Sequence, residues 1–292
     1  MQILFSPAIV LMNRLNYSQK FIVLGCLSIL PLLFVTLILY QNLNRDTLES
    51  QRGLERLRQI EVVSKAIQLL QQHRGLSTAV LGGFNTFHDK QVSKAQAASL
   101  ALHTIEQRVS LNPTAQAAFK AAQSTWADIQ QNSANLNVDT SYVKHTQLIT
   151  QLLAAENSLG DDTLLHLDRD IDIYHLIVLL TKELPVVLEH IGQLQAYGID
   201  YLTTKSITED EKLSLLLLKA SIDQSLHSIN ALIDATHQSN PDLASALEVT
   251  RESIDNTAQF ITTHVIPDIT QGTFTTTPDY YYTAVTLALD TV

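Results

Sequence analysis

The sequence contains one run of 20 consecutive residues without a charged side chain, FIVLGCLSILPLLFVTLILY at residues 21–40. A helix rises ~1.5 Å per residue, so a run of this length reaches across the ~30 Å hydrocarbon core of a bilayer. Arg14 and Lys20 precede the run, and no acidic residue occurs before it ends. Because basic residues are retained on the cytoplasmic side, we expect residues 1–20 to be cytoplasmic and everything after Tyr40 to be exported.

The apolar run is interpreted as an uncleaved transmembrane helix. A cleaved signal peptide is the competing interpretation, but the following sequence, QNLNRDTLES, has no pair of small residues suited to cleavage. Pro31 inside the run is compatible with a spanning helix. Met12 opens the segment MNRLNYSQKF and is an alternative start to Met1. No second apolar run of this length follows, so the sequence predicts a single span.

Charge and motifs argue against several classes of protein. The formal net charge of −10 argues against nucleic acid as a partner. Cys26 is the single cysteine, so neither a disulfide nor a cysteine metal site is expected. The chain has no His-Glu-x-x-His, Gly-x-Ser-x-Gly or P-loop motif, and DRDID at residues 168–172 lacks the glycine and distal glutamate of a calcium loop. We therefore expect no enzyme activity, catalytic residue, cofactor or metal.

The rest of the chain is divided into helices by capping residues, glycines and prolines. The start signals are Asn112–Pro113, the capping box Thr208–Glu211, Asn240–Pro241 and Thr277–Pro278. The stop signals are the glycine pair at 82–83 and Gly160, and Pro185 is expected to kink its helix. The predicted helices cover residues 41–81, 88–110, 113–134, 141–158, 170–203, 209–237 and 241–265, and an eighth starts at 278.

Four of these helices lie on each side of the irregular connector GDDTLLHLDRD. No alternating apolar pattern long enough for a sheet is found. We therefore predict an all-α fold, in which the transmembrane helix at 21–40 is followed by two up-and-down four-helix bundle units, at residues 41–160 and 161–292.

A guanidinium interrupts the apolar face of the first predicted helix. In steps of three and four residues, this face reads Val63, Ile67, Leu70, Arg74, Ser77 and Leu81, and His73 lies on the neighbouring track. Arginine cannot escape burial by losing its proton, so an anion must lie close to it. Two alternatives are open: an interhelical ion pair with Glu183, Glu189 or Asp172, or a small anion or carboxylate ligand bound in the bundle interior.

The fifth predicted helix carries a second apolar stripe with polar residues at its border. The segment GQLQAYG places Gln195 and Tyr197 between two glycines, Gly192 and Gly198. The segment is interpreted either as a ligand-contacting surface or as a place where two helices pack closely.

These two stretches resemble known sensor regions. LLQQHRGLSTAVL, at residues 69–81, resembles the first-helix signature of nitrate- and nitrite-sensing (NIT) domains, roughly Leu-Gln-x-Glu-Arg-Gly-Leu-Ser. LDRDIDIYHLIVLLTKELPVVLEHIGQLQAYG, at 167–198, resembles a stretch of the helical periplasmic regions of bacterial methyl-accepting chemotaxis proteins. MNRLNYSQKFIVLG is similar to the first span of such receptors, so the resemblance covers about residues 12–205. Arg74 matches the arginine of the first motif, His73 replaces its usual glutamate, and Gln195 stands where the second motif has arginine.

The resemblance implies a ligand-sensing region of a chemotaxis-type signal transduction protein in the bacterial inner membrane, with its bulk in the periplasm. It implies a homodimer and a small anionic ligand, nitrate-like or a carboxylate, held between helices. On this interpretation the ligand contacts Arg74, Ser77 and His73 on the first helix and Gln195 and Tyr197 on the fifth. The resemblance implies that a second span and an output module would follow, so the sequence is expected to be either a fragment of such a receptor or a degenerate, sensor-only protein. The alternative is a ligand-free helical scaffold, tethered to the membrane, that binds other proteins.

Overall fold

The computed structural model describes residues 13, 16–166 and 171–289, and this part of the chain is helical, without a strand. The predicted all-α fold is thereby confirmed. The chain divides into two compact units, Met1–Arg52 and Gly53–Val292. Each unit is described by itself.

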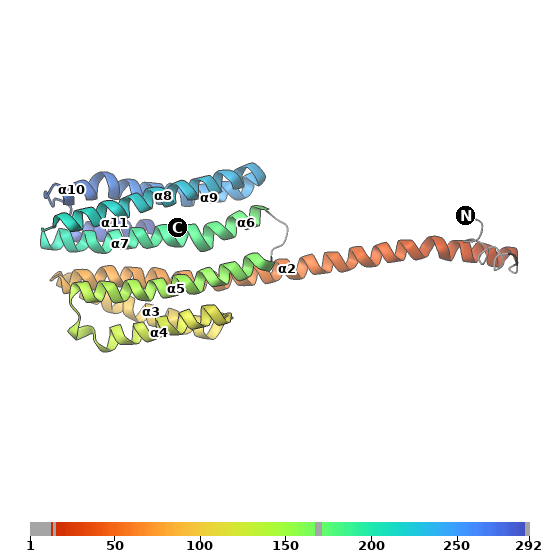
Figure 1. Ribbon diagram of the computed structural model, residues 1–292, viewed down its shortest axis with the longest axis horizontal. Coiled ribbons are helices and arrows are strands. Elements are labelled where there is room, and N and C mark those ends of the chain that lie inside the picture. The colour runs from red at the N-terminus through yellow and green to blue at the C-terminus, as the bar shows by residue number, and fades with distance from the viewer. Residues whose placement is uncertain (1–12, 14–15, 167–170, 290–292) are drawn as a thin grey trace. The chain divides into compact units, whose positions relative to one another are not determined.

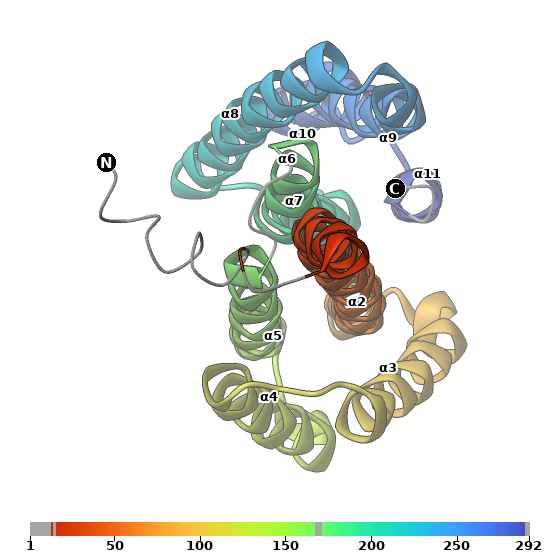
Figure 2. The ribbon, with the colours of Figure 1, turned by 90° about the vertical axis from the view of Figure 1, so that its right-hand side faces the viewer.

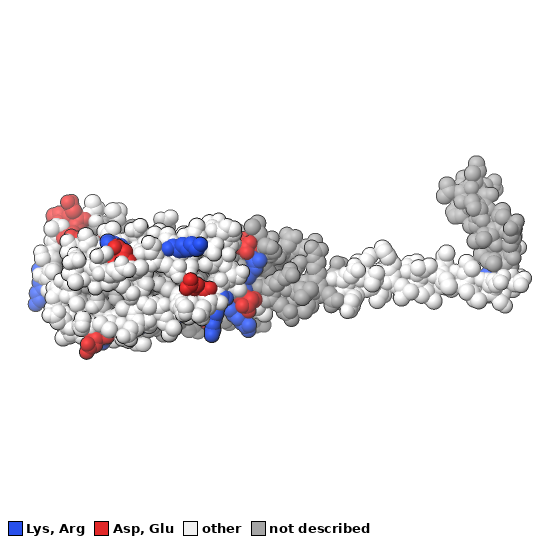
Figure 3. Space-filling view, turned by 90° about the horizontal axis from the view of Figure 1, so that it is seen from below, with Lys and Arg blue, Asp and Glu red and all other residues white. Residues whose placement is uncertain are grey.

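The first unit contains the predicted span. Helix α2 (Tyr17–Leu81) begins in this unit, and its segment Tyr17–Gln41 has a mean hydropathy of 2.8. The side chains of residues 21–40 are exposed, except Val23, which is partly covered. No charged side chain is seen along residues 21–40 on the face in Figure 3. The hydroxyls of Ser28 and Thr36, in the middle of the segment, are satisfied within the helix, since they donate to the Leu24 and Leu32 carbonyls. The segment is therefore long and apolar enough to cross a membrane.

The second unit holds the end of α2 and the helices that follow it (Figure 1). They are α3 (His88–Arg108), α4 (Pro113–Gln131), α5 (Val138–His166), α6 (Ile171–Val178), α7 (Leu184–Thr204), α8 (Glu209–Ser239), α9 (Pro241–Phe260), α10 (Ile266–Thr270) and α11 (Pro278–Leu289). Two π-helical turns, η3 (Leu179–Glu183) and η4 (Ile261–Val265), join α6 to α7 and α9 to α10.

The predicted helix starts are confirmed by their hydrogen bonds. The Asn112 side chain accepts from the backbone N–H of Ala115, and Asn240 caps α9 in the same way. Thr208 and Glu211 form both bonds of the capping box at the start of α8. The end of α2 is also as predicted, because Gly83 follows it with φ of +102°, a conformation that favours glycine.

One prediction for the middle of the chain is wrong. Gly160 does not stop a helix, since α5 continues through it to His166. A Cβ at Gly160 would lie 2.5 Å from Thr181 Oγ1, so the glycine serves close packing of α5 against η3. The connector is accordingly shorter than expected, and most of DRDID lies outside the described residues. The fifth predicted helix is found at residues 171–204, as α6, η3 and α7 in succession. The irregularity expected at Pro185 is a π-helical turn, because proline has no N–H to offer the preceding turn.

The second unit has two hydrophobic clusters. One contains residues 60–70 of α2 and residues of α3, α4 and α5. The other contains residues from the successive elements from α6 to α11. Leu76 and Ala79 of α2 belong to the second cluster, so α2 passes from one cluster to the other between Leu70 and Leu76. Seen end-on, α3 and α4 lie on one side of α2 and α5, and α7 with α8 and α9 on the other (Figure 2). The first cluster thus draws on α2, α3, α4 and α5, and the second on α2, the short helix η1 (Asn85–Phe87) and the elements from α6 to α11. The division into two bundle units at residue 160 stays a prediction, since residues 53–292 form one compact unit.

Alanine substitutions at two glycines test this packing. A Cβ at Gly198 of α7 would overlap the ring of Tyr281, which is fully buried. A Cβ at Gly75 of α2 would meet only ordinary contacts, the nearest 3.6 Å away at Ile199 Cδ1. We expect Gly198→Ala to lower the free energy of unfolding by ~1–3 kcal/mol through overpacking. Gly75→Ala should leave it unchanged or raise it by up to ~1 kcal/mol, because alanine is the better helix former.

The measurement is denaturant unfolding of the full chain in detergent micelles, followed by far-UV circular dichroism. Equal effects of the two substitutions would contradict the described approach of α7 to α11.

Candidate functional site

The polar interruption of α2 lies where the helix passes between the two clusters. Gln71, Gln72, His73 and Arg74 follow Leu70 directly, and each is at most 6% exposed. Buried polar groups require partners, so this stretch determines what the neighbouring helices must present.

Arg74 forms a forked ion pair with Glu189 of α7. Its Nη1 lies 2.6 Å from Glu189 Oε1 and its Nη2 lies 3.1 Å from Oε2. The Arg74 side chain is 0% exposed and that of Glu189 is 7% exposed. A planar guanidinium that meets both carboxylate oxygens in this way forms a strong charge-assisted pair.

Further polar groups bond to the pair, and only Nε of the guanidinium has no partner among the described residues. Gln71 and Gln193 each donate to one oxygen of Glu189, at 3.0 and 2.8 Å, and Arg74 Nη1 donates to Thr146 Oγ1 of α5 at 3.0 Å. Gly192 makes room for the guanidinium, since a Cβ there would lie 3.0 Å from Nη2. Of the two alternatives for the required anion, the structure contains the ion pair. Arg74 as a ligand contact stays a prediction, and a ligand there would have to displace Glu189.

His73 and Ser77 face a different neighbour. His73 Nδ1 lies 2.8 Å from His145 Nε2, and His145 Nδ1 lies 2.7 Å from the Ser141 carbonyl oxygen. That carbonyl can only accept, so His145 carries its proton on Nδ1 and its Nε2 accepts from His73. The unprotonated Nε2 of His73 is therefore an acceptor.

Both histidines are neutral at pH 7. Burial, and then the His145 charge, lowers the pKa of His73 to about 3. Burial lowers the pKa of His145 to about 4, and nearby Arg74 also lowers it. The two rings, with Ser77, Gln91 and Trp126, line a cavity of about 370 Å³ between α2, α3, α4 and α5, which we call the histidine cavity.

Gln195 and Tyr197 separate from the others. Gln195 Nε2 donates to the Tyr282 carbonyl and to Thr286 Oγ1, and so joins α7 to α11. Tyr197 lines a cavity of about 240 Å³ with other tyrosines. The five predicted ligand residues therefore do not converge on one pocket, and neither Arg74 nor Gln195 lines any of the three cavities described here.

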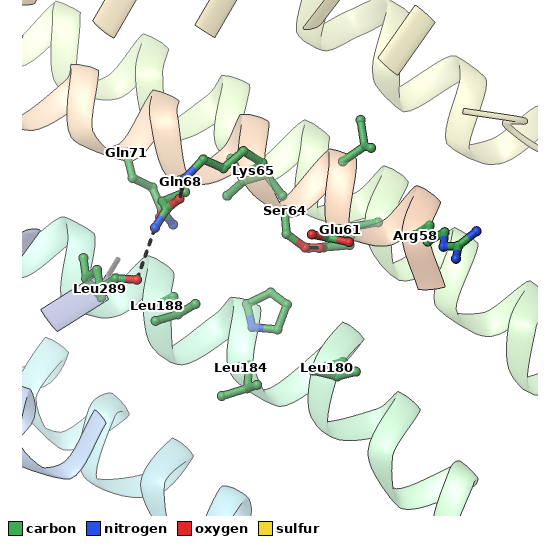
Figure 4. A pocket seen from close by; sticks show the side chains of 14 residues that line it. Arg58, Glu61, Ser64, Lys65, Gln68, Gln71, Leu180, Leu184, Leu188 and Leu289 are labelled. Atoms are coloured by element: carbon green, nitrogen blue, oxygen red, sulfur yellow. Dashed lines mark hydrogen bonds between the residues drawn. The ribbon is translucent and has the colours of Figure 1, made fainter. Parts of the chain in front are cut away.

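The largest of the three cavities, about 580 Å³, lies between α2 and α7, and we call it the α2–α7 cavity. Its α2 side is polar, and Leu180, Leu184 and Leu188 lie across from it (Figure 4). The polar side chains are those of Arg58, Glu61, Ser64, Lys65, Gln68 and Gln71. Gln68 Nε2 donates to the Leu289 carbonyl at 3.1 Å, which brings α11 to one end of the cavity.

Glu156 of α5 also lines the α2–α7 cavity, and sequence reasoning missed it. The residue is 1% exposed, and burial raises its pKa to about 8, although a hydrogen bond with Ser64 opposes the rise. Its Oε2 has no hydrogen-bond partner in the described part of the chain. The available signal was an acid inside the apolar stretch LLAAENSLG, the same kind of signal that singled out Arg74.

Comparisons with protein-family models, with curated proteins and with solved structures return no match for this chain.

Glu156 makes stability depend on pH. Its pKa is raised from 4.5 to about 8, so between these values the folded state holds a proton that the unfolded state has released. The contribution of Glu156 to the free energy of unfolding is therefore fully present below pH 4.5 and is lost as pH rises through 8. The loss is up to ~1.4 kcal/mol per pH unit. Glu156→Gln keeps a polar group without this titration. We expect the variant to exceed the wild type in free energy of unfolding by a few kcal/mol at pH 8, with the difference shrinking toward pH 5.

Denaturant unfolding of the full chain at pH 5, 6, 7 and 8 measures the difference. Glu252→Gln, at an exposed position of α9, is the matched control and should follow the wild type at every pH. A Glu156→Gln curve parallel to the wild-type curve would contradict the burial of this carboxyl group.

Proposed function

We propose that the chain is the ligand-sensing region of a chemoreceptor-type signal transduction protein, and that the α2–α7 cavity is its ligand site. The supporting observation is that α2, the helix with the membrane-length apolar segment, also contributes residues to all three cavities. Ligand occupancy is thereby linked along one chain segment to the membrane. The resemblance of residues 12–205 to such sensor regions agrees with this assignment.

The proposed orientation places residues 1–20 in the bacterial cytoplasm and the helices after the span in the periplasm. The reason is that the charged side chains of residues 1–20 are Arg14 and Lys20, which are both basic. The proposed active form is a homodimer. A ligand that binds one relative position of α2 and α7 better than another would shift the population toward it. Helix displacements of ~1–2 Å are sufficient for such switches.

The cavity suits a small carboxylate with an apolar tail. Its volume falls within the ~300–1,000 Å³ that is typical of small-molecule sites. Leucines on η3 and α7 offer an apolar wall. The α2 side carries the positive charges of Lys65 and Arg58 against the one negative charge of Glu61. Neutral Glu156 adds a hydrogen-bond donor, because a protonated carboxyl group carries an O–H.

A ligand-free scaffold that binds other proteins is the second candidate. The observation in its favour is that Glu189 already neutralises Arg74, so the interior charge requires no bound anion.

Calorimetric titration of the full chain in lipid nanodiscs separates the two functions. The probes are the straight-chain carboxylates from acetate to octanoate, each paired with the alcohol of equal length. The sensor function predicts binding of carboxylates over alcohols, with affinity rising up to ~4-fold for each added CH₂, from ~0.8 kcal/mol of apolar burial. Absence of binding by every carboxylate would favour the scaffold.

Two pairs of variants place the binding site. Leu188→Trp fills part of the cavity from its apolar wall and should weaken octanoate binding at least 10-fold. Leu213→Trp, at an exposed position of α8, should leave octanoate binding unchanged. Lys65→Met should reduce the preference for carboxylate over alcohol, whereas Lys120→Met, exposed on α4, should retain it. Octanoate binding that is insensitive to Leu188→Trp would place the ligand elsewhere.

A further inference from the structure

The cavity that contains Tyr197 is separate from the proposed carboxylate site and has a different chemistry. We call it the tyrosine cavity. It measures about 240 Å³ and is formed by α2, α5, α7 and α8. Its lining residues are Thr78, Val138, Asp139, Tyr142, Val143, Tyr197, Asp200, Tyr201, Glu211 and Ser214.

Three aromatic rings follow one another along the cavity. The ring centroids of Tyr142 and Tyr197 lie 4.4 Å apart, and those of Tyr197 and Tyr201 lie 6.0 Å apart with the planes within 6° of parallel. The Arg74 guanidinium carbon lies 5.5 Å from the centroid of the Tyr142 ring. One member of the row therefore already contacts a cation, as the negative face of an aromatic ring favours.

The charge of the lining is negative. Asp139, Asp200 and Glu211 contribute carboxylates, and no Lys or Arg is among the described residues that line the cavity. The carboxylates lie close enough to influence one another: burial first, and then the charges of Glu211 and Asp139, raise the pKa of Asp200 to about 6. One of the three has a structural role, because Glu211 Oε2 accepts from Thr208 in the capping box. Asp200 has no such role in the described structure.

A buried hydroxyl at the same cavity has no partner. Thr78 is 2% exposed, and its Oγ1 makes no hydrogen bond within the described residues. Other buried threonines of this chain donate to the carbonyl four residues earlier, as Thr163 does to Leu159 and Thr181 to Ile177. An unsatisfied buried hydroxyl costs ~1–3 kcal/mol, so a group that enters the cavity and bonds to it would remove this cost.

We propose that the tyrosine cavity binds a small organic cation, an amine or a quaternary ammonium compound with a polar group. The cationic centre lies against the tyrosine faces, and its charge is balanced by Asp200 with Asp139. The polar group of the ligand bonds to Thr78. A metal ion fits less well, because the described residues include no group of three or more His, Cys, Asp or Glu side chains placed to hold one. This site would give the region a second ligand, of opposite charge to the first.

The test compares choline with its uncharged isostere 3,3-dimethylbutan-1-ol, which has the same shape and hydroxyl without the charge. Both are titrated calorimetrically into the full chain in nanodiscs, and butane-1,4-diamine is titrated as a second cation. We expect at least one of the two cations to bind. If choline binds, its affinity should exceed that of the uncharged isostere at least 10-fold. Absence of binding by both cations at 10 mM would overturn the proposal, and so would choline and isostere of equal affinity.

Variants locate the cation. Asp200→Asn removes a charge with little change of shape, and Tyr197→Leu removes an aromatic ring face. Each substitution should weaken binding of the cation at least 10-fold. Glu252→Gln is the matched control for loss of a carboxylate outside the cavity, and its affinity should equal that of the wild type. Circular dichroism of each variant verifies folding. A cation that binds folded Asp200→Asn as tightly as the wild type would overturn the assignment to this cavity. Because octanoate binding is measured separately, failure of this proposal leaves the carboxylate site standing.

Discussion

The buried contact between Arg74 and Glu189 is the interaction on which the arrangement of α2 and α7 depends. A guanidinium keeps its charge at any pH the protein meets, so it cannot enter an interior without an anion. The structure meets this requirement with one carboxylate, three neutral polar side chains and a glycine that leaves space for the guanidinium. The pair lies where α2 leaves one hydrophobic cluster and joins the other. Loss of either partner would leave an unbalanced charge at the junction of the two clusters.

Three other buried ionisable groups near α2 behave in the opposite way. Glu156, His73 and His145 can reach a neutral form, and burial shifts each pKa toward that form. The interior around α2 therefore combines one full ion pair with neutral hydrogen-bonding groups. This difference is chemical in origin, because carboxyl and imidazole groups lose their charge at modest cost and a guanidinium does not.

Much of the fold could be predicted from the sequence because its signals are local. Asn112 and the Thr208–Glu211 box act within one helical turn, and the apolar run at residues 21–40 is visible from composition alone. The inward orientation of Arg74 followed from helical periodicity, and Glu189 was one of three acids that the sequence offered as partners. Gly160 was misread because its effect depends on Thr181, which lies against it only in the folded chain.

The site could be predicted less well, because periodicity identifies a buried face and not the neighbour that the face meets. Consecutive residues of a helix point ~100° apart. His73 and Ser77 consequently line the histidine cavity, Arg74 contacts α7, and Thr78 lines the tyrosine cavity. Residues 73–78 of α2 thus face three different sets of neighbouring helices, although the sequence showed only a single buried face. Which helix covers each side of α2 is a tertiary property.

A double-mutant cycle on the ion pair tests the account most directly. Arg74→Met and Glu189→Gln are made singly and together in the full chain, and the free energy of unfolding is measured in denaturant at pH 7. A buried pair predicts a loss of ~3–5 kcal/mol for each single change, because the remaining charge has no partner. The double variant should lose much less than the sum of the two, with a coupling energy above ~2 kcal/mol. Additive losses, or single changes that cost less than ~1 kcal/mol, would contradict the central place of this pair.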